Sequence, residues 1–104
     1  MKRRAYLMRL KPGCAAEYRR RHDELWPEMA KVLKEAGISD YSIWLDEATG
    51  TLFAVQKYED EGRLAALASH PVVRLWWDYM ADIMETHPDH APVEEPLTEV
   101  FRLD

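Results

Sequence analysis

The residues most able to do chemistry in this sequence are Tyr18 and His22, within EYRRRHDELWPEM at residues 17–29. Most positions there are charged, and the apolar ones fall at helical spacing. Residues four apart on a helix place their Cβ atoms about 5–6 Å apart on one face. An imidazole transfers protons near neutral pH, and a neighbouring phenol orients polar ligands. The spacing leaves two interpretations open: an acid–base pair in a pocket, or a core histidine hydrogen-bonded to backbone or tyrosine.

The second candidate is the tryptophan pair in WWDYM, residues 76–80. Adjacent helix positions point about 100° apart, so the two indoles do not share one environment. The expected buried stripe is Val72, Trp76, Tyr79, Met80 and Ile83, with Trp77 at its edge beside Val73 and Met84. Trp77 is then either a flank or dimer contact, or a platform for the apolar face of a sugar ring. The platform requires that Trp77 and His22 face the same cavity.

Other candidate residues carry weaker signals. Tyr41 opens the segment DYSIWLDE, where an ordinary strand tyrosine is favoured over a ligand contact. His70 and the HPDH segment at 87–90 lack the spacing of a metal site, and Cys14 is expected to be structural. The sequence contains no glycine-rich phosphate loop and no G-x-S-x-G motif. We therefore expect no metal and no cofactor.

The elements that must position these residues follow from periodicity and breakers. We expect a strand at 4–10, a helix at 15–36, a hairpin of strands at 40–47 and 51–59, helices at 60–70 and 71–84, and a strand at 97–103. Pro27 is expected to kink or restart the first helix, and Gly37 to end it. This βαββαβ order predicts an α+β, ferredoxin-like fold: a four-stranded antiparallel sheet with helices on one face.

The strands carry apolar side chains on both faces. Ile43 and Leu45 point one way and Trp44 the other, while Phe53 and Val55 oppose Leu52 and Ala54. Since the helices cover only one face, we expect a second subunit to cover the other, giving a homodimer.

Length and composition narrow the class of protein. The 104 residues fit a single domain, 1–104, and the net charge of −5 argues against a nucleic-acid surface. The single cysteine suits a reducing compartment. The start, MKRRAYLMRL, is not a complete signal peptide, and no apolar run approaches the roughly 20 residues of a membrane span. We expect a cytoplasmic protein with no membrane partner.

Five segments together resemble the L-rhamnose mutarotase family over nearly the whole chain. They are EYRRRHDELWPE (17–28), YSIWLD (41–46), LFAV (52–55), RLWWDYMADIM (74–84) and EVFRL (99–103). The resemblance implies an isomerase that interconverts the α and β anomers of L-rhamnose, built as a ferredoxin-like homodimer of the dimeric α/β-barrel type. By position it implies His22 as proton donor and Tyr18, Tyr41, Trp76 and Trp77 as substrate contacts.

The loop after the tryptophans departs from the family pattern. The family reads P-D-N-S-P, whereas this chain reads Pro88-Asp89-His90-Ala91-Pro92. If that loop closes the site, the lost amide and hydroxyl alter sugar preference. The general base stays open among a tyrosine, a carboxylate such as Asp89, and water.

Mutarotation suits a chain with one good histidine and no cofactor motif. It needs a proton on the ring oxygen and the loss of one from the anomeric hydroxyl, with no redox step. Positioned acid–base groups accelerate such steps by about 10²–10⁴-fold. Two competing interpretations are a cofactor-free monooxygenase of the dimeric ferredoxin-like class and a non-catalytic sugar-binding module.

Overall fold

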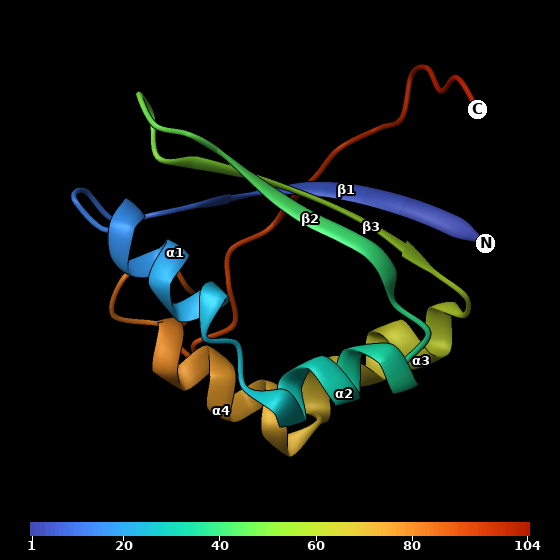
Figure 1. Ribbon diagram of the computed structural model, residues 1–104, viewed down its shortest axis with the longest axis horizontal. Coiled ribbons are helices and arrows are strands. Elements are labelled where there is room, and N and C mark those ends of the chain that lie inside the picture. Colours follow the sequence, from blue (N-terminus) through green and yellow to red (C-terminus); the bar gives the residue numbers. More distant parts are fainter.

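The computed structural model describes residues 1–104 as one sheet with helices packed beneath it (Figure 1). The elements are β1 (Lys2–Arg9), α1 (Ala15–Asp23), α2 (Pro27–Glu35), β2 (Ser39–Asp46), β3 (Thr51–Tyr58), α3 (Glu61–Ala66), the 3₁₀ helix η1 (Leu67–Ser69), α4 (Pro71–Met80) and β4 (Glu95–Pro96). The strand order is β2-β3-β1-β4, with every neighbouring pair antiparallel. The α+β, ferredoxin-like architecture predicted from the sequence is confirmed.

Pro27 restarts the first helix rather than kinking it. α1 ends at Asp23, and Trp26 adopts an extended conformation with ψ of 131°. A residue before proline is pushed out of the helical region, and proline itself suits the first position of a helix. α1 and α2 therefore approach the sheet as two separate helices, which frees α1 to present Tyr18 and His22 at its own angle.

The core lies between the inner face of the sheet and the helices. Its buried residues are Tyr6, Met8, Leu10, Tyr18, Met29, Val32, Leu52, Ala54, Val73, Trp76, Met80, Ile83 and Met84. Two details of the expected tryptophan stripe are wrong. Val73 is buried in place of Val72, and Tyr79 is 37% exposed. α4 ends at Met80, so Ile83 and Met84 enter the core from the turn that follows it rather than from the helix.

The strand expected at 97–103 is also wrong. β4 covers only Glu95–Pro96, and the last backbone bond to β1 runs from the Leu97 N–H to the Ala5 carbonyl. The chain then leaves the sheet on the side away from the helices (Figure 1). Val100 and Phe101 are 93% and 78% exposed, because this chain offers them no surface against which to pack.

Candidate active site

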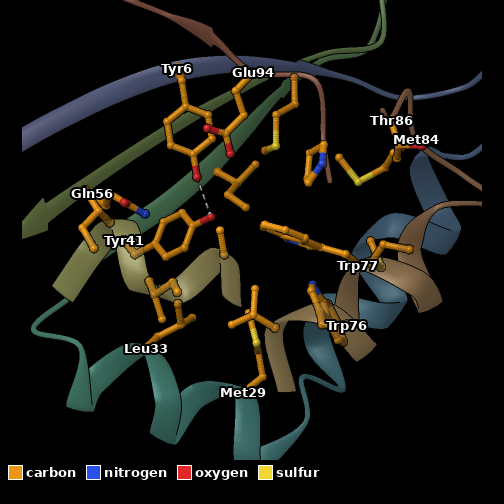
Figure 2. A pocket seen from close by; sticks show the side chains of 18 of the residues that line it. Tyr6, Met29, Leu33, Tyr41, Gln56, Trp76, Trp77, Met84, Thr86 and Glu94 are labelled. Carbon is orange, nitrogen blue, oxygen red and sulfur yellow. Dashed lines mark hydrogen bonds between the residues drawn. The ribbon is translucent and has the colours of Figure 1, made fainter. Parts of the chain in front are cut away.

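All five residues singled out from the sequence line one cavity of about 420 Å³ under the sheet: Tyr18, His22, Tyr41, Trp76 and Trp77. α1 supplies the first two, β2 supplies Tyr41, and α4 supplies the tryptophans. Figure 2 shows Tyr41, Trp76 and Trp77 around the same space. A second cavity, of about 860 Å³, shares four of these residues and extends between α1 and β2. The structure therefore brings together groups that are up to 59 positions apart in the chain.

His22 is held by its own helix. Its Nδ1 lies 3.1 Å from the backbone carbonyl oxygen of Tyr18, so in the neutral ring the Nδ1–H donates to that carbonyl. The Nε2 atom has no hydrogen-bond partner in the protein, and no fully buried side-chain nitrogen or oxygen lacks one. Nε2 is therefore accessible, and His22 lines the cavity. Burial lowers the pKa of His22, and the bond to Tyr18 opposes this shift only in part.

Aromatic rings fix the orientation of the imidazole. The Tyr18 ring lies 4.3 Å from the imidazole centroid at an interplanar angle of 32°. The Trp76 ring packs edge-on against the imidazole, with centroids 5.5 Å apart and an interplanar angle of 89°. Trp26, placed by the break before Pro27, packs edge-on against Trp76 at 5.0 Å. These contacts restrict rotation of the imidazole and so fix the direction of its Nε2 atom.

The two tryptophans differ in burial as expected. Trp76 is 6% exposed, whereas Trp77 is half-buried, and the Arg74 guanidinium lies 5.2 Å from the centroid of a Trp77 ring. Neither indole N–H has a partner in the protein, so both open onto accessible space. Trp77 and His22 line the same cavity, which is the condition that the sugar-platform interpretation required.

Tyr41 is paired with a second phenol. Its hydroxyl lies 3.1 Å from the hydroxyl of Tyr6 on β1. Burial raises the pKa of both tyrosines, so both stay protonated and act as hydrogen-bond donors and acceptors at neutral pH. The Tyr6 side chain is 5% exposed and lines the cavity. No local sequence signal marks Tyr6 as a site residue, because its partner Tyr41 lies 35 positions away.

The loop after α4 is attached to that helix by two contacts. Asp89 is paired with Arg74 at 3.5 Å, and His90 Nδ1 lies 2.8 Å from an Asp78 carboxylate oxygen. The Ala91 N–H and Arg74 lower the pKa of Asp89, which does not line the cavity, so the structure offers no support for Asp89 as the base. His90, at the point of departure from the family pattern, does line it.

His70 has a structural role. Its Nδ1 accepts a hydrogen bond from the Val72 N–H at 3.1 Å, which caps the start of α4. Side-chain caps of this kind satisfy backbone donors that have no partner within the helix. The contact holds the helix that carries both tryptophans.

A sequence model of the L-rhamnose mutarotase family matches residues 3–103. The chain belongs to this family. It is 58% identical over 103 residues to an L-rhamnose mutarotase of Sinorhizobium fredii, and 55% identical over 103 residues to one of Jannaschia sp.; each alignment covers 99% of both chains. A crystal structure of L-rhamnose mutarotase from Formosa agariphila superposes with a TM-score of 0.93 at 47% identity, covering 100% of both chains. This family membership does not favour the two competing interpretations, a cofactor-free monooxygenase and a non-catalytic sugar-binding module.

Proposed function

We propose that this protein is an isomerase that interconverts the α and β anomers of L-rhamnose. One observation carries the proposal: in a chain of the L-rhamnose mutarotase family, the free Nε2 of His22 opens onto a cavity that Tyr18, Tyr41, Trp76 and Trp77 also line. The cavity volume of about 420 Å³ suits a single monosaccharide. We further propose the roles that the family resemblance implies for these five residues: His22 as proton donor, and Tyr18, Tyr41, Trp76 and Trp77 as substrate contacts.

His22 transfers protons at the reacting end of the sugar. In its protonated form the Nε2–H donates to the ring oxygen while the anomeric hydroxyl loses its proton to a base. The bond between the anomeric carbon and the ring oxygen breaks, and an open-chain aldehyde forms. Rotation about the adjacent carbon–carbon bond presents the other carbonyl face, and the ring recloses with the proton transfers reversed. The identity of the base stays open among a tyrosine, a carboxylate of the cavity lining and water.

The remaining site residues bind and orient the sugar. The indole of Trp77 offers a flat surface for the C–H face of the pyranose, and both tryptophan N–H groups are free to bind hydroxyls. The Tyr18 hydroxyl has no partner in the protein and reaches accessible space, and Tyr41 offers a hydroxyl already oriented by Tyr6. Fixing the sugar in this way places its reacting atoms beside Nε2, which lowers the entropic cost of reaction.

We also propose that the protein works as a homodimer. Leu7, Phe53 and Trp44 form one apolar row across three strands on the outer face of the sheet. Trp44 and Phe53 are 68% and 39% exposed, and the tail beyond β4 exposes Phe101 as well. Contact between two such faces buries these side chains, as the apolar pattern of the strands led us to expect.

None of the helices has the length and apolar character that a membrane span requires. The cytoplasmic location and the single domain spanning residues 1–104 stay predictions from the sequence.

The proposed activity is tested by magnetisation exchange between the α and β anomeric protons of L-rhamnose in NMR. We expect the protein, at a concentration far below that of the sugar, to accelerate exchange well above the rate in buffer alone. L-fucose and D-ribose serve as comparison sugars that measure selectivity. Exchange of L-rhamnose at the buffer rate, with protein shown to be folded, would contradict the proposal.

A further inference from the structure

One end of the cavity carries polar groups that the proposed mechanism does not use. Arg4 on β1, Gln56 on β3 and Glu94 just before β4 line the cavity. Figure 2 shows Gln56 and Glu94 next to the Tyr6–Tyr41 pair. All three lie at the sheet side of the cavity, whereas His22 reaches it from α1. The remaining lining residues are mostly apolar, so these three side chains form a distinct polar cluster, which we call the sheet-side cluster.

Gln56 is the most buried member of the sheet-side cluster. It is 2% exposed and sits on the inner face of β3, where an apolar side chain is the usual occupant. Its Oε1 accepts a hydrogen bond from the Arg4 Nε at 2.7 Å, which fixes which end of the amide is oxygen. The amide NH₂ has no protein partner and is not fully enclosed. Figure 2 shows its nitrogen directed toward the cavity and Tyr41. A buried amide in this state has two N–H donors available for a ligand.

Arg4 and Glu94 complete the set of donors and acceptors. The Arg4 Nη1 lies 3.8 Å from the Glu94 Oε1, which is close enough for charge attraction but too far for a hydrogen bond. No other group bonds to the Glu94 carboxylate, so all its acceptor positions are available. Each of the two side chains is 34% exposed. Arg4 is further held over the Tyr6 ring, 4.4 Å from its centroid.

Charged and polar groups face the Glu94 carboxylate from several elements. Burial raises the pKa of Glu94, while the Arg4 guanidinium and His87 act in the opposite direction. Tyr6 and Tyr41 face it from β1 and β2 as neutral phenols.

We propose that Arg4, Gln56 and Glu94 form a subsite for the hydroxyl groups of the sugar remote from its anomeric carbon. Each sugar hydroxyl is both a donor and an acceptor. A pair of adjacent hydroxyls is therefore matched by a carboxylate that accepts and by an amide and a guanidinium that donate. Binding at the sheet side directs the anomeric carbon toward His22. This inference rests on the proposed function and adds the residues that select the sugar.

The subsite assigns Glu94 to binding rather than to proton transfer. A hydrogen bond that is equally strong in the ground and transition states changes KM and leaves kcat nearly unchanged, whereas loss of a general base lowers kcat. The two roles are therefore separable by kinetics.

The test compares Glu94→Ala and Glu94→Gln with the wild type, by NMR exchange at several L-rhamnose concentrations. We expect Glu94→Ala to raise KM about tenfold or more and to change kcat by less than about threefold, because a hydrogen bond to a charged group is lost. Glu94→Gln keeps one acceptor and is expected to recover part of the loss. Glu95→Ala is the matched control. Its carboxylate lies next along the chain but is paired with Arg9 at 3.3 Å and does not line the cavity.

Monodeoxy analogues of L-rhamnose identify the hydroxyl that is bound. The wild type is expected to lose affinity for the analogue that lacks this hydroxyl, whereas Glu94→Ala is expected to bind it and L-rhamnose equally. Binding of the same sugars is measured by saturation-transfer NMR, so that the subsite is tested even if exchange is not accelerated. Unchanged KM and sugar binding in Glu94→Ala would overturn the inference, as would a fall in kcat at constant KM.

Discussion

The Nδ1 atom of His22 lies 3.1 Å from the backbone carbonyl oxygen of Tyr18, one turn earlier in α1. Through this contact, the tyrosine and the histidine four residues apart on one helix face act together. The tyrosine backbone fixes the tautomer of the imidazole, and the tyrosine ring fixes its plane at a centroid distance of 4.3 Å. The core and functional interpretations of His22 are therefore compatible, since one nitrogen is bound by the protein and the other is free for substrate.

The first prediction concerns the pKa of His22. Because burial disfavours the charged ring, we expect an NMR titration of the His22 imidazole to give a midpoint below the ordinary value of 6.5. If the protonated ring donates to the sugar, kcat/KM falls as pH rises through this lowered pKa. The midpoint of this fall in the pH profile of kcat/KM is therefore also expected below 6.5. The resonance is assigned by its loss in His22→Gln. A midpoint above 6.5 would contradict the burial seen here.

The second prediction concerns the phenol pair. Tyr6→Phe removes the hydroxyl that lies 3.1 Å from the hydroxyl of Tyr41, leaving Tyr41 less well oriented. We expect KM for L-rhamnose to rise about three- to tenfold, which corresponds to the loss of one neutral hydrogen bond. Tyr58→Phe, at the end of β3 and outside the cavity lining, serves as the control and should leave KM unchanged. Equal KM in both variants would show that Tyr6 does not position Tyr41.

The third prediction concerns the link between α1 and α4. Arg21 is 8% exposed and donates to the Tyr79 carbonyl at 2.7 Å, to Asp82 at 2.8 Å and to Glu17 at 2.7 Å. Arg21→Ala leaves the Tyr79 carbonyl without this partner and removes buried packing against the Tyr79 ring. We expect the free energy of unfolding to fall by about 1–3 kcal/mol in urea denaturation, from the lost bond to the backbone carbonyl and the lost packing of the side chain.

Its neighbour supplies the control for that measurement. Arg20 also contacts Glu17, but its side chain is 53% exposed. Exposed pairs contribute roughly 0–1 kcal/mol, so Arg20→Ala should change the free energy of unfolding by less than about 1 kcal/mol. Equal losses in Arg20→Ala and Arg21→Ala would show that the link between the helices is not what stabilises the fold.

The fourth prediction concerns the outer face of the sheet. We expect light scattering to give the mass of a homodimer for the wild type and that of a monomer for Trp44→Lys, because a charge replaces the most exposed aromatic side chain of the apolar row. Leu75→Lys is the matched control. Leu75 is an apolar residue on α4 with 60% exposure, close to the 68% of Trp44, but it lies on the helix side. A monomeric wild type would rule out the proposed dimer.

Local signals in the sequence predicted most of the fold. Proline and glycine placed the element boundaries, and the alternation of apolar residues separated the inner and outer faces of the strands. In the tail at 97–103, Leu97, Phe101 and Leu103 fall on one face of an extended chain, and the tail was predicted as a strand. Such a pattern indicates that the apolar side chains are buried against some surface. It does not distinguish a surface of the same chain from one of a second subunit. The strand prediction for this tail was therefore wrong, because its apolar pattern does not require pairing within the sheet of the same chain.

The candidate site was predictable only in part. Tyr18 and His22 share one helix, so their proximity could be predicted from their spacing. Trp76 and Trp77 are adjacent in the sequence, so their proximity was also predictable. The sheet-side cluster joins positions 4, 56 and 94, and no local pattern relates them. Gln56 alone carried a signal, as a polar residue at an inward position of an apolar strand. Which residues of α4 are buried also depends on how the helix packs against the sheet, so Val73 is buried where Val72 was expected.

The central claim is that His22 transfers protons to and from the sugar. The most direct measurement is α–β magnetisation exchange of L-rhamnose with buffer, wild type, His22→Ala and His70→Asn. The last variant removes a histidine outside the cavity while keeping a side chain that caps helices well. We predict acceleration by the wild type and His70→Asn, and a loss of about 10²-fold or more in His22→Ala. Folded His22→Ala that exchanges the anomers as fast as the wild type would contradict the account.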